Sequence, residues 1–229
     1  IMLGLSTGIT NTSYQWQPNM VGADLDLWLR NGVGLDVKQW DDSSGNGNDA
    51  TQETSGNQAG LDGGGLEFDG SDDHYDITNG IVCSAEEGFM VFAVVDLDDI
   101  TNVVILGNDN SNFIEIQTNK RIRITIAGAT ARTCVFEDAL FLADTKMVLG
   151  IQREAGGTGN LNIYKNGSLL TPTSQVADAG GITFNVVGTR AADRFLNGHL
   201  YELLVYETID LTASEINKIS NYLNNKHNL

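Results

Sequence analysis

Residues 121–126 have the sequence RIRITI, in which polar and apolar side chains alternate strictly. Successive side chains of a β-strand point to opposite faces, so this pattern predicts a strand with isoleucine on its buried face. Residues 112–117 (NFIEIQ) show the same alternation, and the three residues between the segments are polar. The two segments therefore predict a hairpin, and we expect Glu115 to pair with Arg121 or Arg123 on its solvent-exposed face.

Other segments carry too many apolar residues for one buried face. Residues 88–96 (GFMVFAVVD) and 146–151 (KMVLGI) are typical of central strands covered on both faces. Residues 160–165 are followed by Asn166-Gly167, a pair that tolerates positive φ and strongly indicates a hairpin. Residues 195–206 predict a further long strand. The dominant period is two, which indicates an all-β protein.

One helix is predicted near the end of the chain. Thr212 and Glu215 have the spacing of a capping box, in which each side chain accepts a hydrogen bond from the other residue's backbone N–H. Ile216, Ile219 and Leu223 follow at helical spacing, with polar residues between them. We expect this amphipathic helix to lie on the surface of a sheet.

The composition excludes several classes of partner. The 229 residues include 13 basic and 30 acidic ones, which gives a net charge of −17. Nucleic acid is therefore not expected as a ligand, because phosphate backbones are bound through Lys and Arg. No apolar run approaches the ~18 residues of a membrane span, so no membrane insertion is expected. Cys83 and Cys134 are too few for a disulfide scaffold, and one bridge or two free thiols both stay open.

The length suits one large all-β domain, and no break in composition marks a second one. Residues 1–20 differ from the rest because they are rich in Ser, Thr, Asn and Gln, with isolated Leu, Tyr and Trp. We therefore divide the chain into an N-terminal arm (1–20), extended until a partner orders it, and a single domain (21–229).

Three segments in order resemble the laminin-G-like branch of the concanavalin A-like lectin/glucanase superfamily. They are residues 25–30 (LDLWLR), 37–50 (VKQWDDSSGNGNDA) and 66–73 (LEFDGSDD). Residues 161–167 (LNIYKNG), residues 198–206 (GHLYELLVY) and the closing helix are similar to that family too. The resemblance implies a two-sheet antiparallel jelly-roll sandwich with a C-terminal surface helix.

The function implied by this resemblance is broad, since members of the family include sugar binders, adhesion modules, enzymes and structural domains. The pattern is similar to that of bacteriophage structural proteins. This implies a non-enzymatic module on a virion surface, such as a capsid decoration or tail appendage, with the arm bound to other virion proteins and with glycans as further ligands. The alternative is a calcium-dependent lectin-like domain, secreted or on a bacterial surface. The oligomeric state stays open.

We do not expect an enzyme. The glucanases of the superfamily carry a Glu-x-Asp-x-Glu strand, which places two carboxylates about 5–5.5 Å apart on one face. This chain has no such string. Glu202 and Glu207 are five residues apart, so on a regular strand they point to opposite faces. A glycoside-active enzyme is therefore the disfavoured alternative.

A calcium-loop pattern runs from Asp42 to Glu53, with Ser44 at the third position and Asn46-Gly47 at the fifth and sixth. The ligands expected for calcium are Asp42, Asn46 and Asp49. The other interpretation is an Asx-rich surface turn whose side chains bind their own backbone. Residues 68–73 form a second acidic turn, which we interpret as a tight connection with solvated carboxylates. No spacing of Cys and His fits zinc.

A sugar site needs an exposed aromatic side chain and polar groups beside it. Trp28 and Trp40 lie in apolar, strand-like settings, so we expect both in the core. The better exposed candidates are His74, Tyr75, Asn108 and Asp109.

Overall fold

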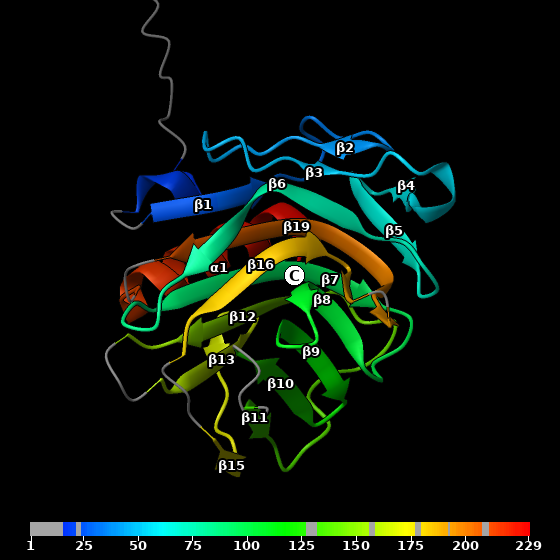
Figure 1. Ribbon diagram of the computed structural model, residues 1–229. Helices are drawn as coiled ribbons and strands as arrows, with labels where there is room; N and C mark the ends of the chain where they lie inside the picture. The colour runs from blue at the N-terminus through cyan, green and yellow to red at the C-terminus, as the bar shows by residue number, and fades with distance from the viewer. Residues whose placement is uncertain are drawn as a thin grey trace, which may run out of the picture.

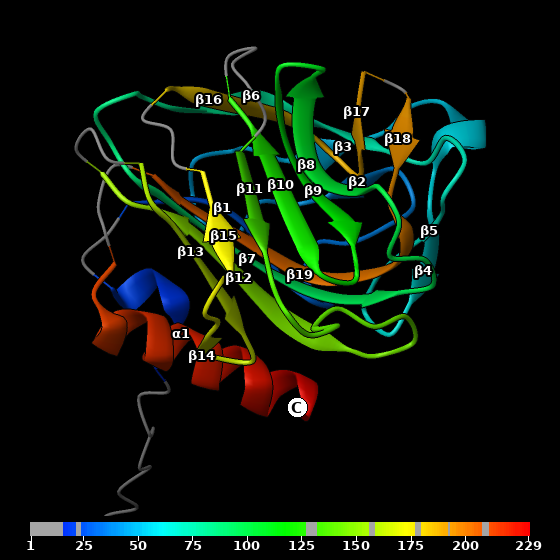
Figure 2. The ribbon, with the colours of Figure 1, turned by 90° about the horizontal axis from the view of Figure 1, so that it is seen from below.

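The computed structural model describes residues 16–21, 24–126, 132–155, 159–176, 180–191, 193–207 and 211–229. These residues form two large antiparallel sheets packed face to face, with a single α-helix outside them (Figures 1 and 2). The predicted all-β, two-sheet sandwich is confirmed. No helix in this part of the chain has the length and apolar character to cross a bilayer.

The first sheet has eight strands, and its long central members are β7 and β19. In spatial order it contains β14 (Ser168–Leu169), β13 (Leu161–Lys165), β12 (Met147–Arg153), β7 (Phe89–Leu97), β19 (Asn197–Glu207), β5 (Gly65–Asp69) and β4 (Gly60–Asp62), and β1 (Asp24–Leu29) also pairs with β19.

The second sheet has nine strands and contains the hairpin predicted from residues 112–126. In spatial order it contains β15 (Ser174–Gln175), β11 (Arg132–Val135), β10 (Arg121–Thr125), β9 (Asn112–Thr118), β8 (Val103–Asp109), β16 (Ile182–Val187), β6 (Tyr75–Cys83), β3 (Ala50–Thr51) and β2 (Gln39–Trp40). A separate ribbon pairs β17 (Thr189–Arg190) with β18 (Arg194–Phe195). The described residues also form two short 3₁₀ turns, η1 (Pro18–Met20) and η2 (Ser55–Asn57).

The main core lies between the sheets, and a second apolar layer lies outside the first sheet. Alternate residues of β7 divide between them: Val91 and Val95 face the main core, whereas Phe92 and Val94 face the outer layer. This confirms β7 as a central strand covered on both faces. The turn after β13 also follows the sequence, with Asn166 at φ 50° and Gly167 at φ 86°.

Helix α1 (Ala213–His227) covers the outer layer. Thr212 is its N-cap and forms the predicted capping box with Glu215. Ile216, Ile219 and Leu223 are buried against the first sheet. Figure 2 shows α1 lying along this sheet, on the side away from β8–β11. The helix ends at His227, four residues beyond Leu223, the last residue of the predicted helix.

One expectation for the hairpin is wrong. Glu115 pairs with Arg123 as predicted, with 3.6 Å between the charged atoms, but the carboxylate is fully buried. The reason is the β17–β18 ribbon, which covers this face: Arg194 forms an ion pair with Glu115, and the Arg190 guanidinium lies 4.2 Å from the centre of the Phe113 ring. A Cβ on Gly107 would lie 2.4 Å from a carbonyl oxygen of the ribbon, so glycine there permits the close approach.

The two cysteines are free thiols. Cys83 and Cys134 are both buried, and they form no disulfide. Burial raises the pKa of each thiol to about 12, so both are protonated and unreactive at neutral pH.

Candidate functional site

A pocket of about 650 Å³ opens on the outer side of the first sheet, where the N-terminal segment meets helix α1. Its lining combines aromatic, amide and cationic side chains and includes no carboxylate. The lining residues are Trp16, Gln17, Arg30, Lys218, Asn221, Tyr222, Asn225 and Lys226. The five from α1 follow the spacing i, i+3, i+4, i+7, i+8 and so form one stripe of the helix.

Two aromatic side chains form the apolar part of the pocket. Trp16 and Tyr222 meet edge to face with 6.1 Å between ring centroids. Trp28 also meets Tyr222 edge to face, with 6.3 Å between ring centroids, and is itself buried. The segment that carries Trp16 is held down by Pro18, whose carbonyl accepts a hydrogen bond of 3.1 Å from the buried Tyr206 hydroxyl. Burial raises the pKa of Tyr222, so its hydroxyl stays protonated at neutral pH.

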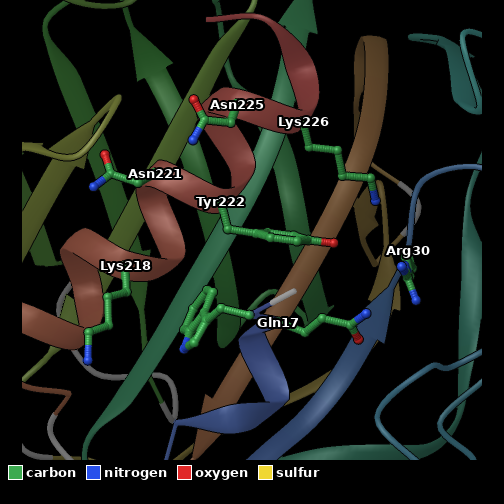
Figure 3. Close-up of a pocket in the computed structure, with 8 residues that line it drawn as sticks. Gln17, Arg30, Lys218, Asn221, Tyr222, Asn225 and Lys226 are labelled. Carbon is green, nitrogen blue, oxygen red and sulfur yellow. The ribbon is translucent and has the colours of Figure 1, made fainter. Parts of the chain in front are cut away.

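The polar groups surround this aromatic pair. Figure 3 shows Tyr222 extending from α1 toward Arg30, with Lys218 and Asn221 on the helix side of the pocket. The Arg30 guanidinium lies 4.9 Å from the centre of the Trp28 ring. Asn221 and Asn225 are exposed, so their amide groups are available as donors and acceptors.

A buried carboxylate, Glu202, fixes the helix beneath the pocket. Its oxygens accept hydrogen bonds of 2.8 Å from Trp28 Nε1 and His227 Nε2, and the Lys226 ammonium lies 2.8 Å away as an ion-pair partner. Burial alone would raise the pKa of Glu202, but the contacts from His227, Lys226 and Trp28 outweigh it and hold this pKa below its ordinary value. Glu202 therefore joins β1, β19 and the end of α1 as an ionised group.

Glu202 and Glu207 do lie on opposite faces of β19, as predicted. Glu202 faces the outer layer, whereas Glu207 stands opposite Phe89, a residue of the main core, and hydrogen-bonds Asp26. Burial, followed by the bond from Asp26, raises the pKa of Glu207 to about 7.

The predicted calcium loop forms a dense set of Asx bonds. Asp42 accepts hydrogen bonds from the backbone N–H groups of Trp28 (2.9 Å), Ser44 (2.8 Å) and Asn48 (3.1 Å), and also from the Ser44 hydroxyl (2.6 Å). Asp49 in turn accepts one from the Asp42 N–H, at 2.8 Å. Asn46 donates to the Leu25 carbonyl, at 3.0 Å. These bonds are those of an Asx-rich turn, and calcium at this loop stays a prediction.

The second acidic turn differs in one respect from the expectation. Asp69 and Asp72 are exposed, but Asp73 is buried and accepts a hydrogen bond of 2.9 Å from the Asp69 N–H. Burial raises the pKa of Asp73. Asp73 is therefore part of the turn's hydrogen bonding and is not a solvated carboxylate.

The four predicted sugar residues differ in exposure: Tyr75 is buried, His74 and Asn108 are half-buried, and Asp109 is exposed. Tyr75 is fully buried in the main core, where its hydroxyl donates to the Val37 carbonyl at 2.8 Å, so its expected exposure is wrong. The cause is its position as the first residue of β6, where it faces inward. His74 is half-buried and its Nδ1 bonds the Asp72 carbonyl. Asn108 and Asp109 end β8, and Asp109 accepts from the Ser111 N–H in a tight turn. Trp28 and Trp40 are buried, as predicted.

Sequence reasoning missed the pocket, although two signals for it are present. Trp16 stood out within the polar segment at the start of the chain. The polar residues between the buried positions of α1 include Tyr222, an aromatic side chain on the solvent side of the helix. What the sequence did not show is that η1 packs back onto α1 and brings these two residues together.

In sequence, neither a protein-family model nor a curated protein matches this chain. Its fold, however, is similar to that of solved structures. A Trypanosoma rangeli sialidase in complex with 2,3-difluoro-KDN has a TM-score of 0.59 at 16% identity, over 89% of this chain and 33% of the sialidase. The ligand-binding domain of botulinum neurotoxin serotype D, in complex with N-acetylneuraminic acid, has a TM-score of 0.55 at 15% identity, over 87% and 51%.

A third neighbour is matched along nearly its whole length. Domain 4 of AbnA, a GH43 extracellular arabinanase from Geobacillus stearothermophilus in complex with arabinotriose, has a TM-score of 0.51 at 15% identity, over 86% of this chain and 98% of the domain. The chain thus spans a third of the sialidase and half of the toxin domain. Identities this low show a shared fold: the chain has the β-sandwich found in these carbohydrate-binding proteins.

Proposed function

We propose that this protein is a carbohydrate-binding module without hydrolytic activity, and that the saccharide lies in the pocket between η1 and α1. The observation that carries the proposal is the pairing of Trp16 and Tyr222 in a concave site edged by amide side chains. Sugar rings present C–H faces that pack on aromatic rings, and hydroxyl groups that bond amides. Two of the structural neighbours were solved with a saccharide bound, which supports the same class of ligand.

The absence of hydrolysis is part of this proposal. It is supported by the two carboxylates of β19, which point to opposite faces. Glu202 is bound by three side chains, and Glu207 is in direct contact with Asp26. Release of reducing sugar from a panel of polysaccharides would contradict this part of the proposal and leave the binding site itself untouched.

Replacement of Trp16 by alanine is expected to weaken saccharide binding by about tenfold or more, because the sugar loses one aromatic surface. A glycan array identifies the saccharide, and isothermal titration calorimetry then gives the affinities. Trp16→Phe should retain most of the affinity. Unchanged melting temperatures would show that both variants are folded. Equal affinities for wild type and Trp16→Ala would place any saccharide outside this pocket.

The array is run in calcium and again in EDTA. Binding that needs calcium would favour the alternative of a calcium-dependent lectin and make Asp42 the next residue to change. Binding that survives EDTA keeps the pocket between η1 and α1 as the site.

We further propose that the protein is located on a virion and that residues 1–20 are the arm that attaches it to the particle. Residues 1–15 lie outside the described residues, whereas Trp16 and Pro18 contact Tyr222 and Tyr206. Deletion of residues 1–15 is therefore expected to leave saccharide binding intact and to abolish incorporation into particles, measured by co-sedimentation. Normal incorporation of the truncated protein would rule out the arm as the attachment.

A further inference from the structure

We infer that the pocket between η1 and α1 selects a saccharide that carries a carboxylate, such as a uronic or nonulosonic acid. The inference rests on the proposed function and adds the chemical class of its ligand. Its starting point is the local charge. In a chain with 30 acidic and 13 basic residues, three of the eight lining residues are basic and none is acidic.

One of these three cations is already neutralised. The Lys226 ammonium lies 2.8 Å from Glu202 Oε2, and its nitrogen is buried. It therefore contributes its aliphatic stem to the pocket, while its charge is taken by Glu202. The charge available to a ligand comes from the other two.

Arg30 and Lys218 have no carboxylate within ion-pair distance among the described residues. Arg30 is held over the Trp28 ring, and its Nε is buried without a hydrogen-bond partner. Lys218 is exposed on the helix. The acidic side chain nearest to it in sequence, Glu215, is bonded to Thr212 at the helix N-terminus.

The two free cations lie on either side of the aromatic pair, as Figure 3 shows for Lys218, Tyr222 and Arg30. A planar guanidinium matches the two oxygens of a carboxylate, and the ion pair is stronger in a pocket than in open water. A sugar whose ring packs on Trp16 or Tyr222 would thus direct a carboxylate at Arg30 or Lys218. The surrounding net charge of −17 opposes long acidic polymers, so a single acidic sugar fits better than an acidic peptide.

The test uses saccharides that differ only at the carboxylate: glucuronic acid against glucose, and 3′-sialyllactose against its methyl ester. In titration calorimetry at low salt we expect the acidic member of at least one pair to bind about tenfold tighter. The pair that responds separates a uronic from a nonulosonic acid. Raising the NaCl concentration from 50 to 500 mM should reduce the preference, because salt screens the cations.

Substitutions of Lys218 and Arg30 test which side chains cause the preference for the acidic sugar. Lys218→Gln should lower affinity for the acidic sugar about three- to tenfold more than affinity for the neutral sugar, while Lys218→Arg retains the preference. Arg30→Gln should abolish the preference for the acidic sugar, and Arg30→Lys should retain only part of it, because Lys lacks the planar guanidinium group. The matched control, Lys38→Gln, removes the same charge from an exposed residue outside the pocket and should change nothing. Lys218 lies on the exposed side of α1, so its variants keep the test valid if Arg30 variants do not fold.

The outcomes separate the two proposals. If no saccharide binds, the proposed function and this inference both fail. Equal binding of acidic and neutral sugars overturns the inference alone, as does a preference that survives in both Lys218→Gln and Arg30→Gln. Binding of a glutamate decapeptide as tight as that of the acidic sugar would also overturn it, because the site would then recognise charge without the sugar.

Discussion

Replacement of Glu202 by alanine is expected to lower the free energy of unfolding by about 3–5 kcal/mol, because it removes one partner of a buried ionic cluster. The carboxylate is fully buried and bonds Trp28, His227 and Lys226. Without it, the indole N–H and the ammonium group lose their acceptor in a site that water does not reach. The contacts also join α1 to the first sheet, so the helix should detach more readily.

Urea denaturation followed by far-UV circular dichroism measures this loss. Glu53→Ala is the matched control, because Glu53 is exposed, and its free energy of unfolding should stay within ~0.5 kcal/mol of the wild-type value.

The pH dependence of stability gives a second check on Glu202. The pKa of Glu202 is lower in the folded protein than its ordinary value of 4.5, so its stabilisation is complete above that value and is lost as the pH falls through the folded-state pKa. Wild type should therefore lose more stability in acid than Glu202→Ala. An equal loss would mean that folding does not lower the pKa of Glu202.

The strand and helix assignments could be predicted because they depend on local periodicity. The alternation in residues 112–126 and the capping box at Thr212 determine β9, β10 and the start of α1. The unbroken apolar run of β7 similarly indicated a strand with two buried faces. These elements can be predicted without knowing which residues pack against them, because the pattern requires only that a face be buried.

The wrong predictions concern which other segment of the chain covers each face of a strand or helix. The alternation correctly placed Glu115 opposite the isoleucines of β9, but nothing in residues 112–126 indicates that Arg194, 79 residues later, belongs to a ribbon that buries it. Tyr75 follows four polar residues and looks exposed, yet it begins a strand with its side chain inward. The pocket was missed for the same reason, since it joins Trp16 to a helix stripe about 200 residues away. Long-range packing decides exposure, and exposure decides which aromatic residue can bind.

Replacement of Asp42 by alanine is expected to cost about 2–4 kcal/mol of stability, because hydrogen bonds to a charged group contribute more than neutral ones. Its carboxylate accepts four hydrogen bonds, and three of the donors are backbone N–H groups. The bond from Trp28 also ties the loop to β1. Asp42→Asn keeps one acceptor oxygen and should lose about half as much. Asp76→Ala, which removes an exposed carboxylate from β6, serves as the control.

The same variant separates the two interpretations of the loop. In an Asx-rich turn the hydrogen-bond donors of the loop supply all the stabilisation, so thermal unfolding of wild type should be the same in 5 mM CaCl₂ and in EDTA. For the weakest class of calcium sites, 5 mM is about 5–50 times Kd. Under calcium binding, wild type would then gain about 1–2.3 kcal/mol, and Asp42→Ala would gain nothing. Because Asp42 already accepts bonds from Trp28, Ser44 and Asn48, an ion could reach it only by displacing some of them. A calcium-dependent increase in wild-type melting temperature that Asp42→Ala lacks would therefore show that this loop rearranges around the metal.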